Sequence, residues 1–385
     1  MQIAHITKKS HFFHNVSYQF EKAFEGQNSY FLHTRELVSQ EEKEAFSKVE
    51  QIYFVGDKTK DIADLFERIQ KFDIVFLHGL DMFSSRLMLF ADMEPKVVFL
   101  FFGGEIYENS KILKSKPFGN LTIKKYNNFD NRKERFIENS LYRIKYVFDT
   151  LESKIKKAIQ KIDYFAVVHK EDYDFMIANK VMPSSVKYFK FSFYPIEFLY
   201  NNEIDTSNSG NNILIGNSRS YANNHLEIFS ILSKFNIANR KVIVPLSYGN
   251  MKGIDSLVQN GKENLGDRFS PLLELMPLHE YNKMLSTCSV AIMNHYRQQA
   301  VGNIIALVYS GAKVYLSSQN TIYHFLKRIG CNVYSVENDL ITSNINALEP
   351  LPREESTQNK EILYRFLNTK KLIEDLRKDI LSIPQ

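Results

Sequence analysis

The chain of 385 residues is 44% hydrophobic, contains 24% charged residues and carries a formal net charge of +5. This length exceeds what one hydrophobic core usually supports, so we expect two domains in an ordinary globular protein. No apolar run approaches eighteen residues, which excludes a membrane-spanning helix from the expected structure.

The first half of the chain is predicted to alternate strands with helices. Strands are expected at residues 2–6, 51–55, 73–77, 96–102 and 164–168, and helices at 62–70 and 133–161. Continuous apolar strands of this kind, separated by helices, are typical of a parallel sheet that is covered on both faces.

The second half is predicted to repeat this alternation after a polar linker at residues 197–212. Strands are expected at 213–215, 241–245, 269–275, 290–294 and 313–316, and helices at 226–235, 251–260, 279–286, 302–310 and 361–380. The fold class is therefore α/β, with two similar domains, residues 1–196 and 213–360, facing across a cleft. Open sheets of this type bind ligands at the carboxyl ends of their strands.

Two further features bear on the compartment of the protein. The N-terminal MQIAHITKKSHFFH lacks a basic start followed by an apolar stretch, so we expect no secretory signal. The two cysteines, Cys288 and Cys331, have neither metal-binding nor redox spacing. So few thiols in a long chain indicate a reducing compartment, the cytoplasm.

Positive charge gathers in residues 111–161, which carry a net charge of +9 and leave about −4 for the rest of the chain. The block also contains seven aromatic residues, which suits either an anionic membrane surface or single-stranded nucleic acid. A solvated helix face explains the charge equally well. No zinc-finger, helix-turn-helix or RNA-binding pattern is present, so we expect no nucleic acid. The residues expected to face the membrane are Lys124, Lys125, Lys133 and Arg135.

The stretch GNSRSYANNH, residues 216–225, separates a buried strand from a helix. Gly216 permits close approach of a ligand to the backbone, and Asn217 and Ser218 offer side-chain donors. Asn223 or Asn224 is placed to cap the next helix, whose N-terminus favours an anion. The stretch therefore predicts a phosphate cradle, with a capped loop as the alternative.

Two other strand ends carry candidate ligand-binding residues. Tyr248, in PLSYG, is placed to stack on a base or sugar, although a turn with one surface tyrosine explains it as well. Glu280 follows His279 at a helix start, where a carboxylate either caps free amides or accepts ribose hydroxyls.

The segment NHYRQQAVGNI, residues 294–304, places Arg297 and Gln298 between a strand and an apolar helix that Gly302 and Asn303 open. An arginine beside a helix N-terminus can clamp a diphosphate. The alternative is a surface turn.

In the first half, FFGGEIYE places Glu105 directly after the most apolar strand, which makes its carboxylate a candidate general base or a helix cap. His5, His14, His78 and His169 also lie near strand ends, where a histidine is more often structural. No metalloprotease, zinc, esterase or phosphate-loop motif occurs. The Asp172-Tyr173-Asp174 sequence fits a helix start better than a metal site.

The segments ILIGNSRSYANNHLEIFSIL, VPLSYG, LMPLHEYNKMLSTCSVAIMNHYRQQAVGNIIALVYSGAKVYL and FFGGEIYE together resemble the bacterial TDP-N-acetylfucosamine:lipid II N-acetylfucosaminyltransferase family. The resemblance covers most of the chain and is strongest over residues 213–316. Compared with that family, this chain carries Glu105 where members commonly have Asp, and it contains no tryptophan.

This resemblance implies a GT-B fold of two Rossmann-like domains, with the acceptor bound by residues 1–196 and the nucleotide sugar by residues 213–360. A C-terminal helix, 361–385, is expected to pack back toward the first domain. The implied donor-binding residues are Gly216, Asn217, Ser218, Tyr248, Glu280, Arg297, Gln298, Gly302 and Asn303. No metal is expected, because helix dipoles and arginine can neutralise the leaving diphosphate.

The expected activity is transfer of a deoxy-amino sugar resembling N-acetylfucosamine, from a nucleoside diphosphate, with TDP favoured, to a polyprenyl-diphosphate-linked glycan. The enzyme would work in surface polysaccharide synthesis, bound peripherally to the cytoplasmic face of the bacterial inner membrane. Glu105 is the first candidate for the catalytic base and His169 the second. The alternatives are a nucleotide-sugar epimerase of the same architecture and a non-catalytic nucleotide- or glycan-binding protein.

Overall fold

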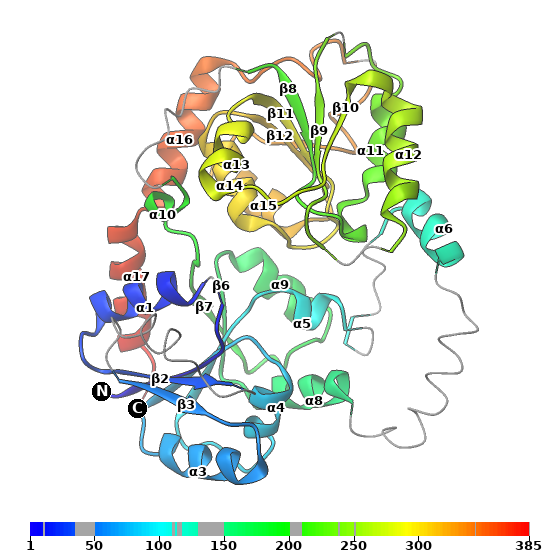
Figure 1. Ribbon diagram of the computed structural model, residues 1–385. Coiled ribbons are helices and arrows are strands. Elements are labelled where there is room, and N and C mark those ends of the chain that lie inside the picture. Colours follow the sequence, from blue (N-terminus) through cyan, green and yellow to red (C-terminus); the bar gives the residue numbers. More distant parts are fainter. Residues whose placement is uncertain are drawn as a thin grey trace. The chain divides into compact units, whose positions relative to one another are not determined.

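The computed structural model describes residues 1–10, 12–34, 51–109, 112–113, 118–129, 150–200, 210–237, 239–249, 252–342 and 344–384. The chain divides into two compact units. The first comprises Met1–Lys114, Arg143–Pro195 and Leu367–Gln385, and the second comprises Ser115–Tyr142 and Ile196–Phe366. Figure 1 shows that each unit contains a sheet flanked by helices.

The first unit is built on a seven-stranded sheet in the order β3-β2-β1-β4-β5-β6-β7, in which every pairing is parallel. Its strands are β1 (Ile3–Thr7), β2 (Asn28–His33), β3 (Ile52–Val55), β4 (Ile74–His78), β5 (Lys96–Leu100), β6 (Tyr164–Val167) and β7 (Lys187–Lys190). The strand order reverses between β1 and β4, which makes that position the topological switch point.

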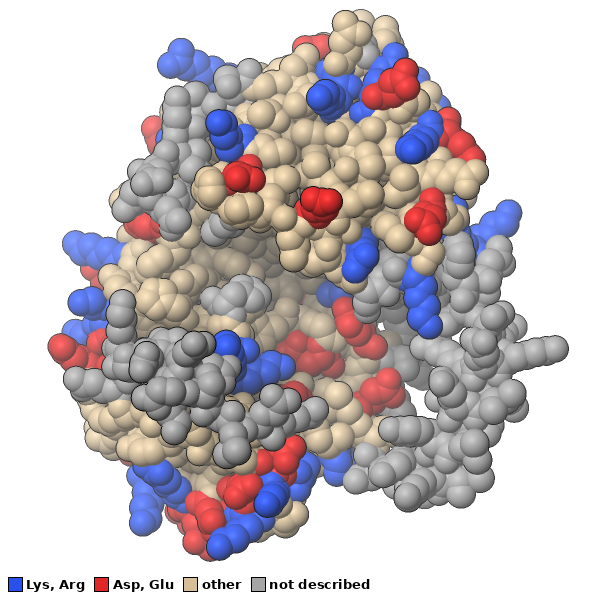
Figure 2. Space-filling model, in the orientation of Figure 1, with Lys and Arg blue, Asp and Glu red and all other residues tan. Residues whose placement is uncertain are grey.

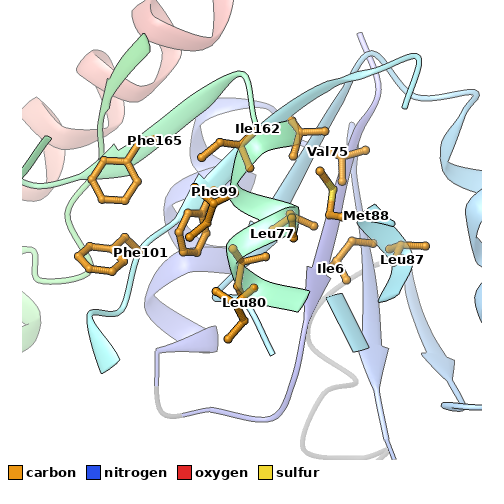
Figure 3. Packing of buried hydrophobic residues seen from close by; sticks show 14 of the residues in the cluster. Ile6, Val75, Leu77, Leu80, Leu87, Met88, Phe99, Phe101, Ile162 and Phe165 are labelled. Carbon is orange, nitrogen blue, oxygen red and sulfur yellow. The ribbon is translucent and has the colours of Figure 1, made fainter. Parts of the chain in front are cut away.

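Helices bury both faces of this sheet, which explains why its strands are continuously apolar. The helices are α1 (Phe13–Ala23), α3 (Thr59–Ile69), α4 (Met82–Met88), α5 (Gly104–Tyr107), α8 (Leu151–Ala158), α9 (Lys170–Ala178) and α17 (Thr369–Leu381), with a 3-10 turn at Ile159–Lys161. One core packs strand residues against α3, α4, α8 and α9 (Figure 3). A second core packs the opposite face against α1 and α17.

The first core derives its stability from large side chains with almost no exposed surface. Phe99 and Phe165 lie at van der Waals distance across adjacent strands, with ring centroids 5.8 Å apart, and Phe101 lies 4.9 Å from Phe165. Figure 3 shows these rings in the same cluster as Leu77 and Leu87. Each fully buried side chain of this size contributes about 1.5–3 kcal/mol to folding.

The second unit contains a six-stranded parallel sheet in the order β10-β9-β8-β11-β12-β13. Its strands are β8 (Asn212–Ile215), β9 (Val242–Pro245), β10 (Phe269–Leu272), β11 (Cys288–Met293), β12 (Lys313–Leu316) and β13 (Tyr334–Ser335). This is the strand order of a dinucleotide-binding fold, with its switch point between β8 and β11.

The helices of the second unit are α6 (Asn120–Phe129), α10 (Ile196–Tyr200), α11 (His225–Leu232), α12 (Ile254–Leu265), α13 (Leu278–Leu285), α14 (Val301–Tyr309), α15 (Thr321–Arg328) and α16 (Arg353–Leu367). Short 3-10 turns lie at Tyr221–Asn223 and Gly266–Arg268. Helices α11 and α12 cover one face of the sheet, where Phe229 and Leu257 enter the core.

The predicted α/β class with two parallel-sheet domains is confirmed, but several element boundaries were wrong. Strand β2 was not predicted, because its apolar run is only three residues long and it begins with the buried Asn28. The helix expected at 361–380 is broken at Asn368, whose side chain accepts a hydrogen bond from the Lys371 amide at 2.9 Å and starts α17. Helix α10 occupies part of the expected linker, and residues 201–209 lie outside the described residues.

Two features concern the division of the chain into units. Residues 367–385, which contain α17, cluster with the first unit, where Leu376 and Ile380 join the core beside α1. Helix α6 falls in the second unit, although the sequence placed it in the first domain. The helix expected at 133–161 is not continuous, because Thr150 is extended and its hydroxyl accepts from the Ser153 amide to begin α8. Residues 130–149 lie outside the described residues.

Candidate functional site

The strongest candidate site lies at the carboxyl edge of the second sheet. Ile215 of β8 pairs with Ile292 of β11, so the loops that follow these two strands lie side by side at the switch point. Because all strands of this sheet are parallel, the loop after β9 emerges at the same edge. This is where open α/β sheets bind their ligands.

Gly216 begins the loop after β8 in a conformation that only glycine tolerates well. Its φ is +65°, and a Cβ placed on it would lie 2.4 Å from Asn223 Oδ1 and 3.0 Å from His225 Nε2. The close approach allows the Asn217 amide to donate to Asn223 Oδ1 at 2.9 Å. A glycine is therefore needed at position 216 because the side chains of Asn223 and His225 pack directly against its Cα.

Three side chains from two loops form a buried network. His295 Nε2 lies 2.9 Å from Asn223 Oδ1 and 3.2 Å from Asn217 Oδ1. Since both neighbours are carbonyl oxygens, the imidazole carries its proton on Nε2 and donates. Asn223 donates in turn to the backbone oxygens of Ser218 at 2.9 Å and Ser220 at 3.2 Å, and this fixes the loop. Asn223 therefore braces the loop instead of capping α11.

Asn224 occupies the N-cap position of α11 but does not cap it. It has a left-handed conformation and makes no side-chain cap hydrogen bond. Its side chain instead donates to the Asn294 backbone oxygen at 2.8 Å and accepts from the Gly119 amide at 2.8 Å. The asparagine thereby ties the loop after β8 to the loop after β11 and to the segment before α6.

Tyr248, after β9, is attached to the network through its hydroxyl group. Asn217 Nδ2 donates to Tyr248 Oη at 2.8 Å, while the Arg219 amide donates to the Tyr248 backbone oxygen at 2.8 Å. Arg219 Nε also donates to the Gly249 oxygen at 3.0 Å. Tyr248 as a residue nevertheless remains 45% exposed. Tyr248 is therefore held at its hydroxyl group and is partly open to solvent.

Arg297 and Gln298 are buried just before α14, each only 8% exposed. Arg297 Nη1 donates to the Gln298 backbone oxygen at 3.4 Å. Ala300, at φ +56°, is the N-cap residue of α14. Gly302 is buried and Asn303 half-buried in the first turn of α14. Arg297 thus comes shortly before a helix N-terminus in the chain, and a buried guanidinium and helix N-terminal amides are both electropositive groups.

Two buried histidines at this edge stay neutral. Burial lowers the pKa of His225 to about 3, and burial together with the charge of Arg297 lowers that of His295 to about 3. Neither ring nitrogen of His225 has a hydrogen-bond partner among the described residues. The imidazoles therefore act here as uncharged polar groups at any pH near neutrality.

The sequence missed a second polar cluster at this edge, after β12. Ser317 donates to Glu337 Oε1 at 2.5 Å, the Ser318 amide to Oε2 at 2.8 Å, and the Ser335 hydroxyl to Oε2 at 3.0 Å. Burial opposes ionisation of Glu337, but these hydrogen bonds hold its pKa below the ordinary value. The run SSQN after the strand KVYL was the available signal.

Glu280 stands apart from the network. Its side chain lies in the first turn of α13, is 57% exposed and is 3.9 Å from His279 Nε2. The structure records no contact between Glu280 and the loops after β8 or β11 in the described residues. A role for this carboxylate in ribose binding remains a prediction.

A second group of predicted residues lies at the carboxyl edge of the first sheet. Gly103, at φ +111°, precedes α5, and Glu105 Oε1 accepts from the Phe102 amide at 3.1 Å. Burial raises the pKa of Glu105 to about 7, against the opposing effects of its backbone hydrogen bonds and of Lys8. Its carboxylate thus caps the turn and also titrates near neutrality.

His169 follows β6 as the N-cap residue of α9 and is buried. Two aspartates lie close to it in the chain: Asp172 accepts from the Tyr107 hydroxyl at 2.5 Å, and Asp174 pairs with Lys170. The aspartates are thus held by a tyrosine and a lysine. In the described ranges, no three His, Cys, Asp or Glu side chains come together as metal ligands would.

His5 and His78 belong to the core of the first unit. Their rings meet at 3.1 Å between His5 Nδ1 and His78 Nε2, while His5 Nε2 lies 3.2 Å from Asn28 Oδ1. The His5 ring also stacks on Tyr30, with centroids 4.6 Å apart. Burial lowers the pKa of His5 to about 3. His14 is exposed on α1.

The basic residues expected at a membrane lie partly on α6, which Figure 1 shows beside α11 and α12. Lys124 is exposed, whereas Lys125 donates to the Ser256 oxygen of α12 at 3.2 Å. Lys133 and Arg135 lie outside the described residues. On the face shown in Figure 2, Lys and Arg are interspersed with Asp and Glu. Among the described residues no helix is long and apolar enough to cross a membrane.

Helix α6 is held in place by side chains of α11. Glu227 accepts from the Thr122 amide at 2.9 Å and from the Thr122 hydroxyl at 2.6 Å. An open groove of about 470 Å³ lies along α6, lined by Leu121, Lys124, Lys125, Leu226, Ser230, Asn260 and Asn264. The first turn of α6 is therefore a fixed part of the second unit.

Comparison with solved structures identifies this architecture as that of GT-B glycosyltransferases. Anabaena Alr3699/HepE, solved with UDP and glucose, matches with a TM-score of 0.61 at 9% identity over 100% of both chains. Sucrose-phosphate synthase from Thermosynechococcus elongatus matches with a TM-score of 0.60 at 10% identity over 99% of each chain. A glycosyltransferase from Rickettsia africae gives 0.57 at 11% identity over 100% of both. At these identities the likeness defines the fold.

The family follows from the sequence itself. Residues 136–351, more than half of the chain, match the model of the 4-alpha-L-fucosyltransferase family, glycosyl transferase group 56. The chain belongs to this family and is a glycosyltransferase. The resemblance drawn from the sequence motifs is thereby confirmed at the level of the family.

Proposed function

We propose that the protein transfers a deoxy-amino sugar resembling N-acetylfucosamine from a nucleoside diphosphate, with TDP favoured, to a polyprenyl-diphosphate-linked glycan. The observation that carries this proposal is the carboxyl edge of the second sheet, where the buried Arg297 comes shortly before Ala300, the N-cap residue of α14. A guanidinium and free helix amides suit a diphosphate, which is both the donor's binding handle and its leaving group.

Three groups of the proposed donor site would contact different parts of the donor. Arg297 and the amides of α14 would hold the diphosphate and stabilise the charge that develops on it. The loop that starts at Gly216 would bring backbone amides close to the same phosphates. Tyr248 would contact the flat base of the nucleoside. Gln298, Gly302, Asn303 and Glu280 remain further candidates for donor contact.

Glu105 would accept the proton of the acceptor hydroxyl. As that oxygen bonds to the anomeric carbon, the bond from this carbon to the diphosphate oxygen breaks, and the electron pair leaves with the nucleoside diphosphate. A base with a pKa of about 7 is well matched to proton transfer near neutral pH. His169 is the second candidate for this role. The transfer would require no metal, since Arg297 supplies the positive charge.

The acceptor's lipid places the proposed enzyme at the cytoplasmic face of the bacterial inner membrane, in surface polysaccharide synthesis. Lys124 and Lys125 on α6 support this proposal, with Lys133 and Arg135 as further members of the same basic block. Each basic side chain near an anionic bilayer adds about 1 kcal/mol to a reversible association.

The test is release of nucleoside diphosphate from TDP-, UDP- and GDP-sugars, with and without a membrane extract that contains lipid-linked oligosaccharides. We expect release from a TDP-amino-deoxy sugar only when the extract is present. Conversion of the donor without release would indicate an epimerase. Nucleotide binding with neither outcome would indicate a non-catalytic binding protein.

A further inference from the structure

Tyr248 is the one donor-site candidate whose side chain is both half-exposed and anchored by a buried side chain of another loop. Its hydroxyl accepts from Asn217 Nδ2 at 2.8 Å, while the residue as a whole is 45% exposed. A tyrosine ring left free would sample several orientations, and a ligand would have to select one of them. Fixing the ring in the free protein removes that cost from binding.

The anchor itself is fixed by His295. Asn217 can present its amide nitrogen to Tyr248 only if its carbonyl oxygen faces the other way, and His295 Nε2 lies 3.2 Å from that oxygen. The same Nε2 lies 2.9 Å from Asn223 Oδ1, which also accepts from the Asn217 backbone amide at 2.9 Å. Asn217 is therefore oriented at both its backbone and its side chain.

The network spans two strands of the sheet. Asn217 follows β8 and His295 follows β11, and their strands pair directly at Ile215 and Ile292. The donor direction runs from His295 to Asn217 and from Asn217 to Tyr248, so each hydrogen bond orients the next group. No member of this series is charged, which leaves its geometry unchanged by pH near neutrality.

We propose that His295, Asn223 and Asn217 are positioning residues that hold Tyr248 as a preorganised stacking face for the nucleobase of the donor. The inference rests on the proposed function for the identity of the ligand. It assigns to His295 and Asn223 a role in base recognition, and it separates that role from the diphosphate contacts of Arg297.

The first experiment needs no ligand. In protein labelled with ¹³C at its tyrosine rings, the signal of Tyr248 is assigned by its loss in Tyr248→Phe. We expect this signal to shift and broaden in Asn217→Ala and His295→Leu, and to be restored in His295→Gln, whose amide can still donate to both oxygens. Tyr364→Phe, which alters a half-exposed tyrosine on α16, is the control. An unchanged Tyr248 signal in Asn217→Ala and His295→Leu would overturn the proposal that the hydrogen bonds from His295 to Asn217 and from Asn217 to Tyr248 orient the ring.

The second experiment compares binding of TDP and inorganic pyrophosphate by calorimetry. Tyr248→Phe is expected to weaken TDP binding about fivefold, as loss of one neutral hydrogen bond does, and Tyr248→Ala by tenfold or more. Pyrophosphate has no base, so its binding should not change in either variant. The double variant Asn217→Ala with Tyr248→Phe should bind TDP no more weakly than Asn217→Ala alone.

The outcomes separate the two proposals. Equal losses for TDP and pyrophosphate would overturn the stacking role of Tyr248. Additive losses in the double variant would overturn the positioning role of Asn217. Neither result would remove the diphosphate site. If the wild-type protein bound no nucleotide, the proposed function would fail and the stacking role with it. The tyrosine signals would then still show whether His295 and Asn217 orient Tyr248.

Discussion

The carboxyl edges of the two sheets differ in whether their key groups titrate. At the edge of the first sheet, burial raises the pKa of Glu105 to about 7, so its charge changes at neutral pH. At the edge of the second, the groups are amides, hydroxyls, neutral histidines, the carboxylate of Glu337, whose pKa is held below its ordinary value, and arginines that are always charged. Burial is the common cause: it raises the pKa of Glu105 into the neutral range, and it lowers the pKa of His225 and His295 so that their charge does not change there.

This difference matches the two tasks of a transferase. Removing a proton from an acceptor requires a base that titrates near the working pH. Holding the diphosphate and orienting the nucleobase of the donor call for groups whose charge does not vary with pH. Burial lowers the pKa of His295 to about 3, so the Nε2 proton that orients Asn217 stays in place without adding charge.

The largest effect is expected at the titrating edge. Glu105→Gln keeps the size and the acceptor oxygen that binds the Phe102 amide but removes the base. Turnover should fall about 10²–10⁴-fold with little change in donor affinity. The check is the initial rate of nucleoside diphosphate release with acceptor present, against Glu108→Gln, an exposed carboxylate one turn away. A rate within twofold of the wild type would transfer the role to His169 or to another group.

At the non-titrating edge, Arg297→Lys should weaken binding of nucleoside diphosphate about 10–100-fold. Lysine keeps the charge but loses the fork that can engage two phosphate oxygens. Calorimetry with TDP measures the change, and Arg268→Lys, an exposed arginine after α12, is the control. Unchanged affinity would show that the diphosphate binds elsewhere.

The buried histidines predict how stability depends on pH. The pKa of His225 is about 3 in the folded protein and 6.5 in the unfolded chain, so unfolding takes up a proton between these values. Its contribution to stability is complete above pH 6.5 and is lost as the pH falls, by up to about 1.4 kcal/mol per pH unit. His225→Leu should make the acid limb of a urea unfolding series shallower by that amount. An identical slope would mean that His225 is not buried as a neutral ring.

The smallest effect concerns α6. Lys124→Gln removes one exposed charge and should weaken sedimentation with anionic vesicles about fivefold, corresponding to roughly 1 kcal/mol. Neutral vesicles serve as the control, and added salt should reduce the difference. Lys125 is a poorer test, because its ammonium group also bonds to α12. Binding that is insensitive to both the substitution and salt would contradict the membrane role of this helix.

The positions of the strand-end loops could be predicted because the local sequence of each one indicates it. Gly216, Arg297 and Glu105 all follow short apolar runs, and that local pattern is enough to place them at a sheet edge. Strand β2 was not predicted because it begins with Asn28, which is buried partly for a non-local reason: its Oδ1 lies 3.2 Å from Nε2 of His5 on the neighbouring strand β1.

The partners within the site could not be predicted in the same way. His295 and Asn217 are separated by 78 positions and meet because β8 and β11 are neighbours in the sheet. Nothing in the local sequence around His295 distinguishes it from a core histidine. Glu280 was also chosen from local sequence, by its position at a helix start; its carboxylate is exposed, and its contact with the donor stays a prediction.

The most direct test of the account measures two pH dependences on one preparation. Binding of a TDP-sugar without acceptor, and turnover with acceptor, are followed between about pH 6 and 9. The account predicts that affinity stays constant while turnover rises about tenfold per unit up to pH 7 and then levels, as Glu105 loses its proton. If affinity and turnover titrated together, or if turnover did not vary with pH, the division of labour between the two sheet edges would be contradicted.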